Sequence, residues 1–322
     1  HLLVDHRFSN WADPDDGLDT VVPHELFHGI QAAYSPDWPV WFSEGTATWA
    51  ERQYIDDSFD FMGFAGAYLD DVSRPIDRPP AGPVPSFAYG ACLFFDFLTL
   101  RHDATLMTEI LELGSIDVLA DPDADLMATI DAALQARSDT LEAAWVDFAR
   151  WNLAVGNRAG GVESYPYAER LGAPQPEERG AFLDVDPRYF AYGTIYLRLA
   201  HEGGPMALWA EDDGSAVHLD LYPADGTEDI QPSVWTGTLD AGTQELGDLP
   251  AGTYFLLGTV PTRVDQSINV RLCLGASADV AGCAEEPEPT DEDGGGCGCR
   301  TSPSGLGWAV PIGLLGLVSR RR

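Results

Sequence analysis

The residues best suited to chemistry form one short pattern, His24-Glu25-Leu26-Phe27-His28. Two histidines four residues apart lie on the same face of a helix, one turn from each other. Their ring nitrogens can therefore bind one Zn²⁺ ion at about 2.0–2.1 Å each. Glu25 would lie beside the metal, where it could take a proton from a water molecule whose pKa the zinc lowers towards ~7. The pattern predicts metal-assisted hydrolysis, with a peptide carbonyl as the electrophile.

A pattern with three fixed positions also arises by chance, and the alternative is a helix that carries two surface histidines. The neighbouring residues favour a buried helix instead. We expect four apolar side chains to pack on the other face of this helix: Leu26, Phe27, Ile30 and Ala33. The metal hypothesis also requires a third ligand further along the chain.

Glu44 is the candidate third ligand. The extended metzincin pattern would require Gly and His at positions 31 and 34, but the sequence has Gln31 and Tyr34. A loop that contains Pro36 and Pro39 can reverse the chain, so that a second helix brings Glu44 to the metal. The alternative is a carboxylate at a helix start, where the helix dipole favours negative charge. Two histidines and one carboxylate would leave a fourth position open, as catalytic zinc sites do.

This region resembles the gluzincins, the metallopeptidases that combine HExxH with a downstream glutamate. The resemblance includes Glu44 directly before Gly45, within the aromatic segment WFSEGTATWAE. Over roughly residues 4–113, the pattern also resembles a family of predicted secreted metalloproteases of myxobacteria and their relatives, including the segment FAYGACLF at 87–94. The resemblance implies a zincin-like catalytic region.

The resemblance also implies a role for each candidate residue. His24, His28 and Glu44 would hold one catalytic Zn²⁺, and Glu25 would activate water and later protonate the leaving amine. In several gluzincins a tyrosine on a later helix donates to the oxyanion, and Tyr89 is our candidate for that role. The alternative is that Tyr89 only packs at the start of a helix.

Two features depart from the family pattern. Thermolysin-like enzymes have an aspartate four residues after the ligand glutamate, where this sequence has Thr48. Glu51, or a group upstream, would then have to orient the histidine. Gluzincins also build the edge strand that binds substrate from sequence before the HExxH helix. We expect residues 1–5 (HLLVD) to be the last piece of that sheet, so that the catalytic region is N-terminally incomplete.

The elements that must position these residues change in kind along the chain. Residues 158–187, rich in Gly, Pro and charge, are predicted to be a linker. Alternating apolar residues in 188–283 predict an antiparallel β-sandwich. The expected fold class is therefore a multidomain α+β protein, with a mainly helical zincin-like region (1–157), a β-sandwich accessory domain and a short hydrophobic C-terminal tail. Within the helical region, helical spacing of apolar residues predicts six segments: 24–34, 44–54, 87–100, 104–113, 125–136 and 140–153.

The C-terminus is predicted to be an acidic Gly/Pro linker (284–296) followed by a sorting or anchor tail (297–322). The apolar run at 305–318 is shorter than the ~20 residues that span a bilayer, and three arginines follow it. The arrangement resembles the C-terminal sorting tails of myxobacterial surface proteins. It implies export, recognition by C-terminal sorting machinery, contact with a membrane and processing near Cys297 or Cys299. The alternative is an ordinary hydrophobic C-terminal helix.

The net charge excludes one class of function, and the cysteine content fits an exported protein. The 322-residue chain has 52 acidic and 18 basic side chains, a net charge of −34, which excludes a nucleic-acid binder because counterion release needs a basic surface. Cys273 and Cys283 flank a short loop that an exported protein could bridge, and Cys92 is expected to be a buried free thiol.

An acidic segment before the first histidine offers a second candidate metal site. The segment contains four aspartates: Asp13, Asp15, Asp16 and Asp19. Ca²⁺ binding there is a weaker hypothesis than a solvated loop, because the EF-hand spacing is missing.

Together these observations predict an exported zinc endopeptidase that is displayed on the cell surface or released after tail processing. Two alternatives remain. One is a catalytically inactive surface protein that binds or adheres through a peptidase scaffold. The other is a zinc hydrolase that acts on a non-peptide amide.

Overall fold

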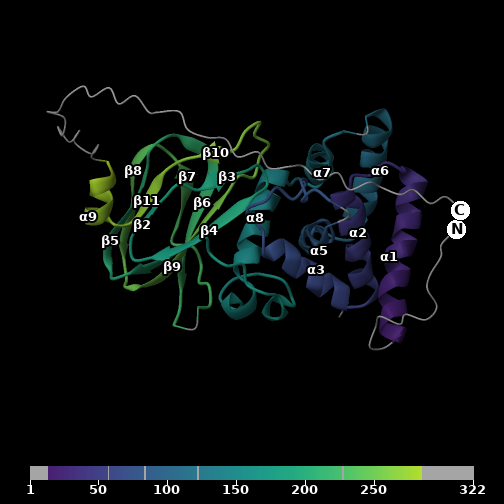
Figure 1. Ribbon diagram of the computed structural model, residues 1–322, viewed down its shortest axis with the longest axis horizontal. Helices are drawn as coiled ribbons and strands as arrows, with labels where there is room; N and C mark the ends of the chain where they lie inside the picture. The colour runs from purple at the N-terminus through teal and green to yellow at the C-terminus, as the bar shows by residue number, and fades with distance from the viewer. Residues whose placement is uncertain (1–13, 57, 83–84, 122, 227, 285–322) are drawn as a thin grey trace, which may run out of the picture. The chain divides into compact units, whose positions relative to one another are not determined.

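The computed structural model describes residues 14–56, 58–82, 85–121, 123–226 and 228–284 (Figure 1). The described residues belong to one compact unit. The expected sheet fragment at 1–5 and the predicted tail at 297–322 lie outside the described residues, as does the acidic linker after residue 284. The described part is a mixed α+β structure in which a helical region precedes the sheets.

Eight helices of five residues or more form the helical region within the described residues. Side-chain caps begin three of them: Ser58, Asp125 and Thr140 each accept a hydrogen bond from a backbone N–H two or three residues later. The bounds are α1 Pro14–Tyr34, α2 Val40–Tyr54, α3 Phe59–Leu69, α4 Ser86–Gly90, α5 Cys92–Arg101, α6 Thr105–Ala120, α7 Leu126–Gln135 and α8 Leu141–Leu153. Helix α3 was not expected from the spacing of apolar residues, and the expected helix at 87–100 is divided into α4 and α5.

Helix α1 starts ten residues before the first histidine. Pro14 occupies its first position, where the missing N–H costs nothing. Asp15, Asp16 and Asp19 therefore lie on the helix, and the expectation of an acidic loop is wrong for these three residues. Asp13 lies outside the described residues. The candidate Ca²⁺ loop is not formed.

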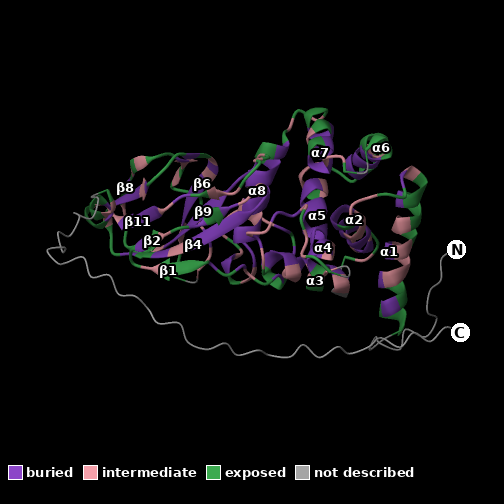
Figure 2. Ribbon diagram, turned by 45° about the horizontal axis from the view of Figure 1, so that its top comes forward, coloured by how far each residue is buried: buried purple, intermediate pink, exposed green. Residues whose placement is uncertain are grey.

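The buried and exposed faces of α1 are the reverse of the expected ones. Three of the four residues expected to pack against the protein are exposed: Leu26 (59%), Ile30 (42%) and Ala33. Phe27 is half-buried against Trp49. The buried face instead carries His24 and Gln31. Figure 2 shows this contrast between α1, which is largely pink and green, and α5, which is mostly purple.

The core of the helical region surrounds α5. Its sequence, CLFFDFL, is apolar around most of the helix, as expected for a helix that is covered on every side. Cys92 in this helix is a buried free thiol, which confirms the expectation from its apolar setting. The surrounding core is strongly aromatic and includes Phe42, Phe94, Phe95, Trp145 and Phe148.

Two sheets follow the helices. The strands of the larger sheet lie in the order β1-β4-β9-β6-β7, and those of the smaller in the order β2-β11-β5-β8. All pairs in the two sheets are antiparallel except β1 with β4. Both sheets contribute to one hydrophobic core, which includes Leu197, Leu208, Leu256 and Leu272. The bounds are β1 Glu178–Gly180, β2 Leu183–Val185, β4 Thr194–His201, β5 Gly204–Ala210, β6 Gly214–Ala224, β7 Trp235–Leu239, β8 Gly242–Leu249, β9 Gly252–Thr259 and β11 Leu272–Ala276. A separate pair joins β3 Arg188–Tyr189 to β10 Ile268–Asn269.

The larger sheet also packs on the helices. Side chains alternate between the two faces of a strand, so one strand can serve two cores. Tyr196 of β4 and Phe255 of β9 belong to the helical core, whereas their neighbours Leu197 and Leu256 belong to the core between the sheets. Tyr196 donates a hydrogen bond to the Ala149 carbonyl of α8 at 2.7 Å. The helices and sheets are therefore joined by a shared core.

The segment at 158–187, which we expected to be a linker, is packed within the same unit. Tyr165, Tyr167 and Leu171 are buried in the helical core. Strands β1 and β2 also lie in this segment, so the sheets start before residue 188. The segment is a structured connection and not a free spacer.

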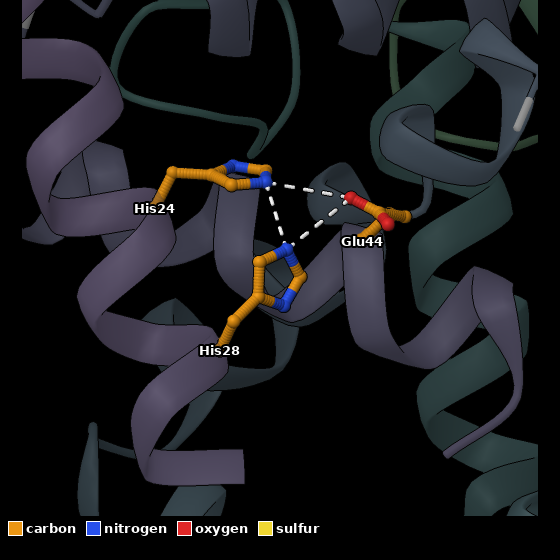
Figure 3. Close-up of side chains that lie close together, drawn as sticks. All are labelled: His24, His28 and Glu44. Atoms are coloured by element: carbon orange, nitrogen blue, oxygen red, sulfur yellow. Dashed lines mark hydrogen bonds and ion pairs between the residues drawn. The ribbon is translucent and has the colours of Figure 1, made fainter. Parts of the chain in front are cut away.

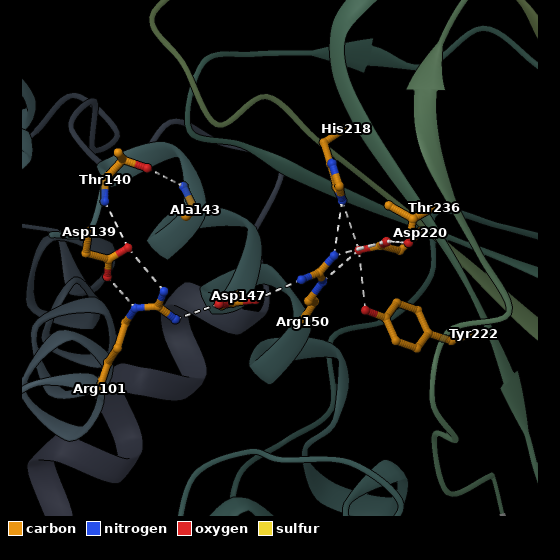
Figure 4. A network of polar contacts seen from close by, with 10 residues as sticks. All are labelled: Arg101, Asp139, Thr140, Ala143, Asp147, Arg150, His218, Asp220, Tyr222 and Thr236. Carbon is orange, nitrogen blue, oxygen red and sulfur yellow. Dashed lines mark hydrogen bonds and ion pairs between the residues drawn. The ribbon is translucent and has the colours of Figure 1, made fainter.

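Ion pairs tie α8 to the sheet and to the other helices (Figure 4). Arg150 of α8 makes two hydrogen bonds to the buried Asp220 of β6, at 2.8 and 3.2 Å, and a third to Asp147 at 2.8 Å. Arg101 of α5 in turn bonds Asp147 and Asp139, at 2.5 and 2.6 Å. These five hydrogen bonds connect α5, α8 and β6 in one network.

A disulfide joins Cys273 of β11 to Cys283, as the sequence suggested for an exported chain. It fastens the short helix α9 Ser277–Val280 to the smaller sheet. Within the described residues, no helix combines the length and apolar character needed to cross a membrane.

Candidate metal centre

Three side chains named in the sequence analysis converge at one point between α1 and α2 (Figure 3). The Nε2 atoms of His24 and His28 are 3.1 Å apart. The Oε2 atom of Glu44 lies 3.4 Å from His24 Nε2 and 3.5 Å from His28 Nε2. The three donor atoms thus form a nearly regular triangle.

The size of this triangle fits a zinc ion. Ligand atoms arranged tetrahedrally at about 2.0–2.1 Å from zinc stand about 3.3 Å from each other. The observed separations of 3.1, 3.4 and 3.5 Å bracket that value. Two imidazole nitrogens and one carboxylate also suit zinc, whereas calcium and magnesium prefer sites made only of oxygen ligands. Three protein ligands would leave a fourth position for water or substrate.

The third candidate ligand, Glu44, comes from the body of a helix. Helix α2 begins at Val40, so Glu44 lies beyond its first turn. The effect of the helix dipole falls off within that turn, so a stabilised helix start does not account for this carboxylate. The residues between the helices, including Pro36 and Pro39, reverse the chain as expected.

Close packing behind α2 fixes the position of Glu44. A Cβ atom added at Gly45 would stand 2.8 Å from Ala91 Cβ and 3.0 Å from the ring of Phe95. A Cβ atom at Gly90 would stand 2.5 Å from the Phe64 carbonyl oxygen. Glycine at these two positions lets α2, α3 and α4 approach closely enough to bring Glu44 near Tyr89.

His24 is oriented by a buried carboxylate. Its Nδ1 donates to Glu51 Oε1 at 2.8 Å, and the Ser58 hydroxyl donates to Glu51 Oε2 at 2.9 Å. Burial raises the pKa of Glu51, but both of its oxygens accept a hydrogen bond, which favours the ionised form. A proton on Nδ1 leaves the lone pair of Nε2 free to bind a metal. Glu51 therefore orients His24, the role expected of it because position 48 is a threonine and not an aspartate.

His28 is oriented by a residue that the sequence analysis did not assign to the site. Its Nδ1 lies 2.7 Å from Gln31 Oε1. Its spacing could have indicated this role, because Gln31 is three residues after His28 and thus on the same helical face.

The electrostatics of the triangle favour a positive charge at its centre. Burial would lower the pKa of His24, but Glu44 and Glu51 outweigh it and raise the pKa to about 9. Burial would raise the pKa of Glu44, but His24 and His28 outweigh it and lower the pKa to about 2. The hydrogen bond with Glu44 also raises the pKa of His28. The two carboxylates therefore favour a proton on His24 at neutral pH when no metal is bound.

Tyr89 lies beside the triangle, where an oxyanion donor would be needed. Its ring stacks on His24 with the centroids 5.9 Å apart, and on its other side on Phe64 at 4.5 Å. Burial, followed by the nearby Glu44 carboxylate, raises the pKa of Tyr89 to about 12. The hydroxyl is therefore a protonated donor at neutral pH. Glu25 directly follows His24 on α1, is half-buried, and carries a charge that also acts on the Tyr89 hydroxyl.

A second group of potential ligands among the described residues consists of Asp184, Cys273 and Cys283. Its two sulfur atoms are joined in the disulfide, so neither is a thiolate that could bind a metal. The three-residue triangle of His24, His28 and Glu44 is thus the metal-ligand candidate that the geometry supports.

Comparisons with known proteins do not add to this assignment. No protein-family model matches the chain, and no curated protein matches it. Among solved structures, the chain is similar to PliG of Aeromonas hydrophila, a periplasmic inhibitor of g-type lysozyme. The two are 17% identical with a TM-score of 0.24, and the match covers 31% of this chain and 98% of PliG. The Yersinia pseudotuberculosis-derived mitogen is 9% identical, with a TM-score of 0.24, over 34% and 91% of the two chains. Both TM-scores are too low to support an argument about fold or function.

Proposed function

We propose that this protein is a zinc-dependent peptidase of the gluzincin type, with a zincin-like helical region and an accessory β-sandwich. The observation that carries the proposal is the triangle of His24 Nε2, His28 Nε2 and Glu44 Oε2, whose edges of 3.1–3.5 Å suit tetrahedral zinc. The hydrogen bonds to both Nδ1 atoms support it further, because they leave each Nε2 available as a ligand.

The residues around the triangle suit hydrolysis of an amide. Bound at His24, His28 and Glu44, zinc would supply a Lewis acid that polarises a carbonyl and lowers the pKa of water. Glu25 takes a proton from the attacking water and gives it to the leaving amine nitrogen. Tyr89 donates its hydroxyl hydrogen to the substrate oxygen as negative charge develops there.

Export and surface sorting belong to the same proposal. The disulfide between Cys273 and Cys283 supports an oxidising compartment, where such bonds persist. The acidic linker, Cys297 and Cys299 in the Gly-rich segment after it, and the three final arginines support recognition by a sorting machinery and contact with a membrane. The substrate is then a protein or peptide outside the cytoplasm.

The first experiment measures metal content. We expect the purified chain without residues 297–322 to contain about one zinc ion per molecule by elemental analysis, since three ligands of the catalytic type converge at one point. His28→Ala, which removes one ligand, should lose most of that zinc. A folded wild-type chain that takes up no zinc, even when zinc is supplied in excess, would contradict the proposal.

The second experiment separates catalysis from binding. Glu25→Gln should retain zinc but lower the rate of peptide cleavage by about 10²–10⁴-fold, because the amide cannot accept the proton of water. Cleavage is measured with a quenched-fluorescence peptide library, beside a panel of non-peptide amides. Zinc binding without turnover of any of these substrates would favour the inactive binding protein, and turnover of non-peptide amides alone would favour the other hydrolase.

A further inference from the structure

We infer that Gln31 is a positioning residue that sets two zinc ligands at once, His28 through its ring and Glu44 through the backbone before it. The inference rests on the proposed metal site and concerns the geometry that builds it. Gln31 is a residue of α1, is 2% exposed and faces α2.

The hydrogen bonds of Gln31 fix which end of its amide faces which helix. Its Nε2 lies 2.8 Å from the Ser43 carbonyl oxygen and 2.6 Å from Thr46 Oγ1. A carbonyl oxygen can only accept, so the nitrogen end of the amide must face α2. Thr46 Oγ1 can accept from Gln31 because its own hydrogen goes to the Phe42 carbonyl at 2.7 Å.

The opposite end of the amide then determines the tautomer of His28. With its nitrogen on α2, Gln31 presents Oε1 to His28 Nδ1 at 2.7 Å. An amide oxygen has no hydrogen to give, so Nδ1 must carry the proton and donate. Nε2, which points at Glu44 in Figure 3, keeps its lone pair for the metal.

The same amide holds the backbone of the third ligand. Ser43 directly precedes Glu44, and its carbonyl is bonded to Gln31 while its hydroxyl donates to Gln31 Oε1 at 3.2 Å. Movement of Gln31 would therefore shift His28 and Glu44 relative to each other. His24 depends instead on Glu51, so the two histidines are held by chemically different partners.

Two substitutions test the two halves of this inference. Gln31→Leu removes both the acceptor for His28 and the donor to α2. Gln31→Glu keeps an acceptor for His28 but sets an oxygen against the Ser43 carbonyl. Partners of metal ligands are typically worth 10–100-fold in metal affinity, so we expect Gln31→Leu to weaken zinc binding by about that factor. Gln31→Glu should weaken it by a smaller factor, through Glu44 alone.

Zinc affinity is measured by competition with a chromogenic chelator, and ligand geometry by the visible absorption of bound Co²⁺. Both substitutions should change the Co²⁺ spectrum in protein whose near-UV circular dichroism remains native. Gln135→Leu, on the exposed face of α7, makes the same chemical change away from the site and should alter neither readout.

Each outcome separates this inference from the function it rests on. Unchanged zinc affinity and an unchanged Co²⁺ spectrum in Gln31→Leu would overturn the positioning role while leaving the peptidase proposal intact. An unchanged Co²⁺ spectrum in Gln31→Glu would overturn the link to Ser43 and Glu44. If Gln31→Leu does not fold, the nearly isosteric Gln31→Glu decides the question. A wild-type chain that binds no zinc would overturn the proposed function itself.

Discussion

His24 and Glu44 show how much of the site's character comes from single side chains and their neighbours. The pKa of His24 is raised to about 9 and that of Glu44 is lowered to about 2, because each residue stabilises the charged form of the other. A metal ion that binds here must displace the protons shared by this group. Zinc affinity should therefore fall as the solution is made more acidic, as it does wherever protons compete for the ligands.

Tyr89 gives the clearest prediction at the scale of one residue. Tyr89→Phe removes the hydroxyl but keeps the ring that stacks on His24 and Phe64. If the hydroxyl stabilises the developing oxyanion, kcat should fall by about 10²–10³-fold while zinc content and KM change little. Because burial and Glu44 raise the pKa of Tyr89 to about 12, the wild-type rate should show no loss from this group near neutral pH. Steady-state kinetics on one peptide decide the matter, and a kcat equal to wild type would reduce Tyr89 to a packing role.

Two helices and the turn between them set the geometry of the ligands. The spacing of His24 and His28 and the need for a second helix at Glu44 could be predicted from the sequence, because they follow from helical periodicity. The buried face of α1 could not be predicted from the sequence in this way. Leu26 and Ile30 look like core residues in the sequence, but the face that turns inward is the one with polar contacts to Glu51 and α2. Hydrophobic periodicity alone therefore misassigned the orientation of this helix.

Glycine at the crossing of α2 with α4 and α5 leads to a prediction at the scale of elements. Gly45→Ala would place a Cβ atom 2.8 Å from Ala91 Cβ, so α2 must move. Overpacking of this kind costs about 1–3 kcal/mol of unfolding free energy, and zinc affinity should fall with it because Glu44 is the adjacent residue.

Gly63→Ala is the matched control for this change. Gly63 also lies within a helix, α3, but has nothing within 4 Å of an added Cβ atom. It should instead stabilise the protein by about 0.4–1 kcal/mol, since alanine reduces the entropy of the unfolded chain. Urea unfolding of both variants compares the two effects. A Gly45→Ala protein as stable as Gly63→Ala would contradict the role of close helix approach.

Across the whole described unit, helices and sheets share a core where the sequence analysis expected a division. The change from helical to alternating periodicity was expected at residue 188, whereas β1 begins at Glu178, and it marks a change of element within one compact unit. Tyr196, Phe255 and Leu257 explain the difference, because they point away from the core between the sheets and into the helical core. The run YFLL at 254–257 carried the signal, since an uninterrupted apolar run in a strand indicates burial on both faces. Residues 158–187 are rich in Gly, Pro and charge, so the burial of Tyr165 and Tyr167 could not be predicted from the composition of that segment.

The ion pair between Arg150 and Asp220 tests how strongly helices and sheet depend on each other. Asp220 is fully buried, and Arg150 reaches it from α8. Asp220→Asn leaves the shape nearly unchanged but removes the charge that Arg150 pairs with, so the variant should lose about 3 kcal/mol of unfolding free energy at pH 7. Asp248→Asn, an exposed aspartate on β8, should change it by no more than about 0.5 kcal/mol.

The pH dependence of that difference identifies the charge as its source. Burial would raise the pKa of Asp220, but hydrogen bonds from His218, Arg150 and Thr236 outweigh it and hold the pKa well below its usual range. The unfolded chain, with an aspartate pKa of about 3.9, therefore binds the proton first, and the stabilisation by Asp220 is lost as the pH falls from about 5 towards the folded pKa. Acidic residues that contact neither Arg150 nor Asp220 titrate alike in wild type and Asp220→Asn, so their effect cancels in the difference. Urea unfolding of both proteins between about pH 7 and pH 3 should show the gap between them closing. A gap that stays constant over this range would mean that Asp220 acts through its shape and hydrogen bonds and not through its charge.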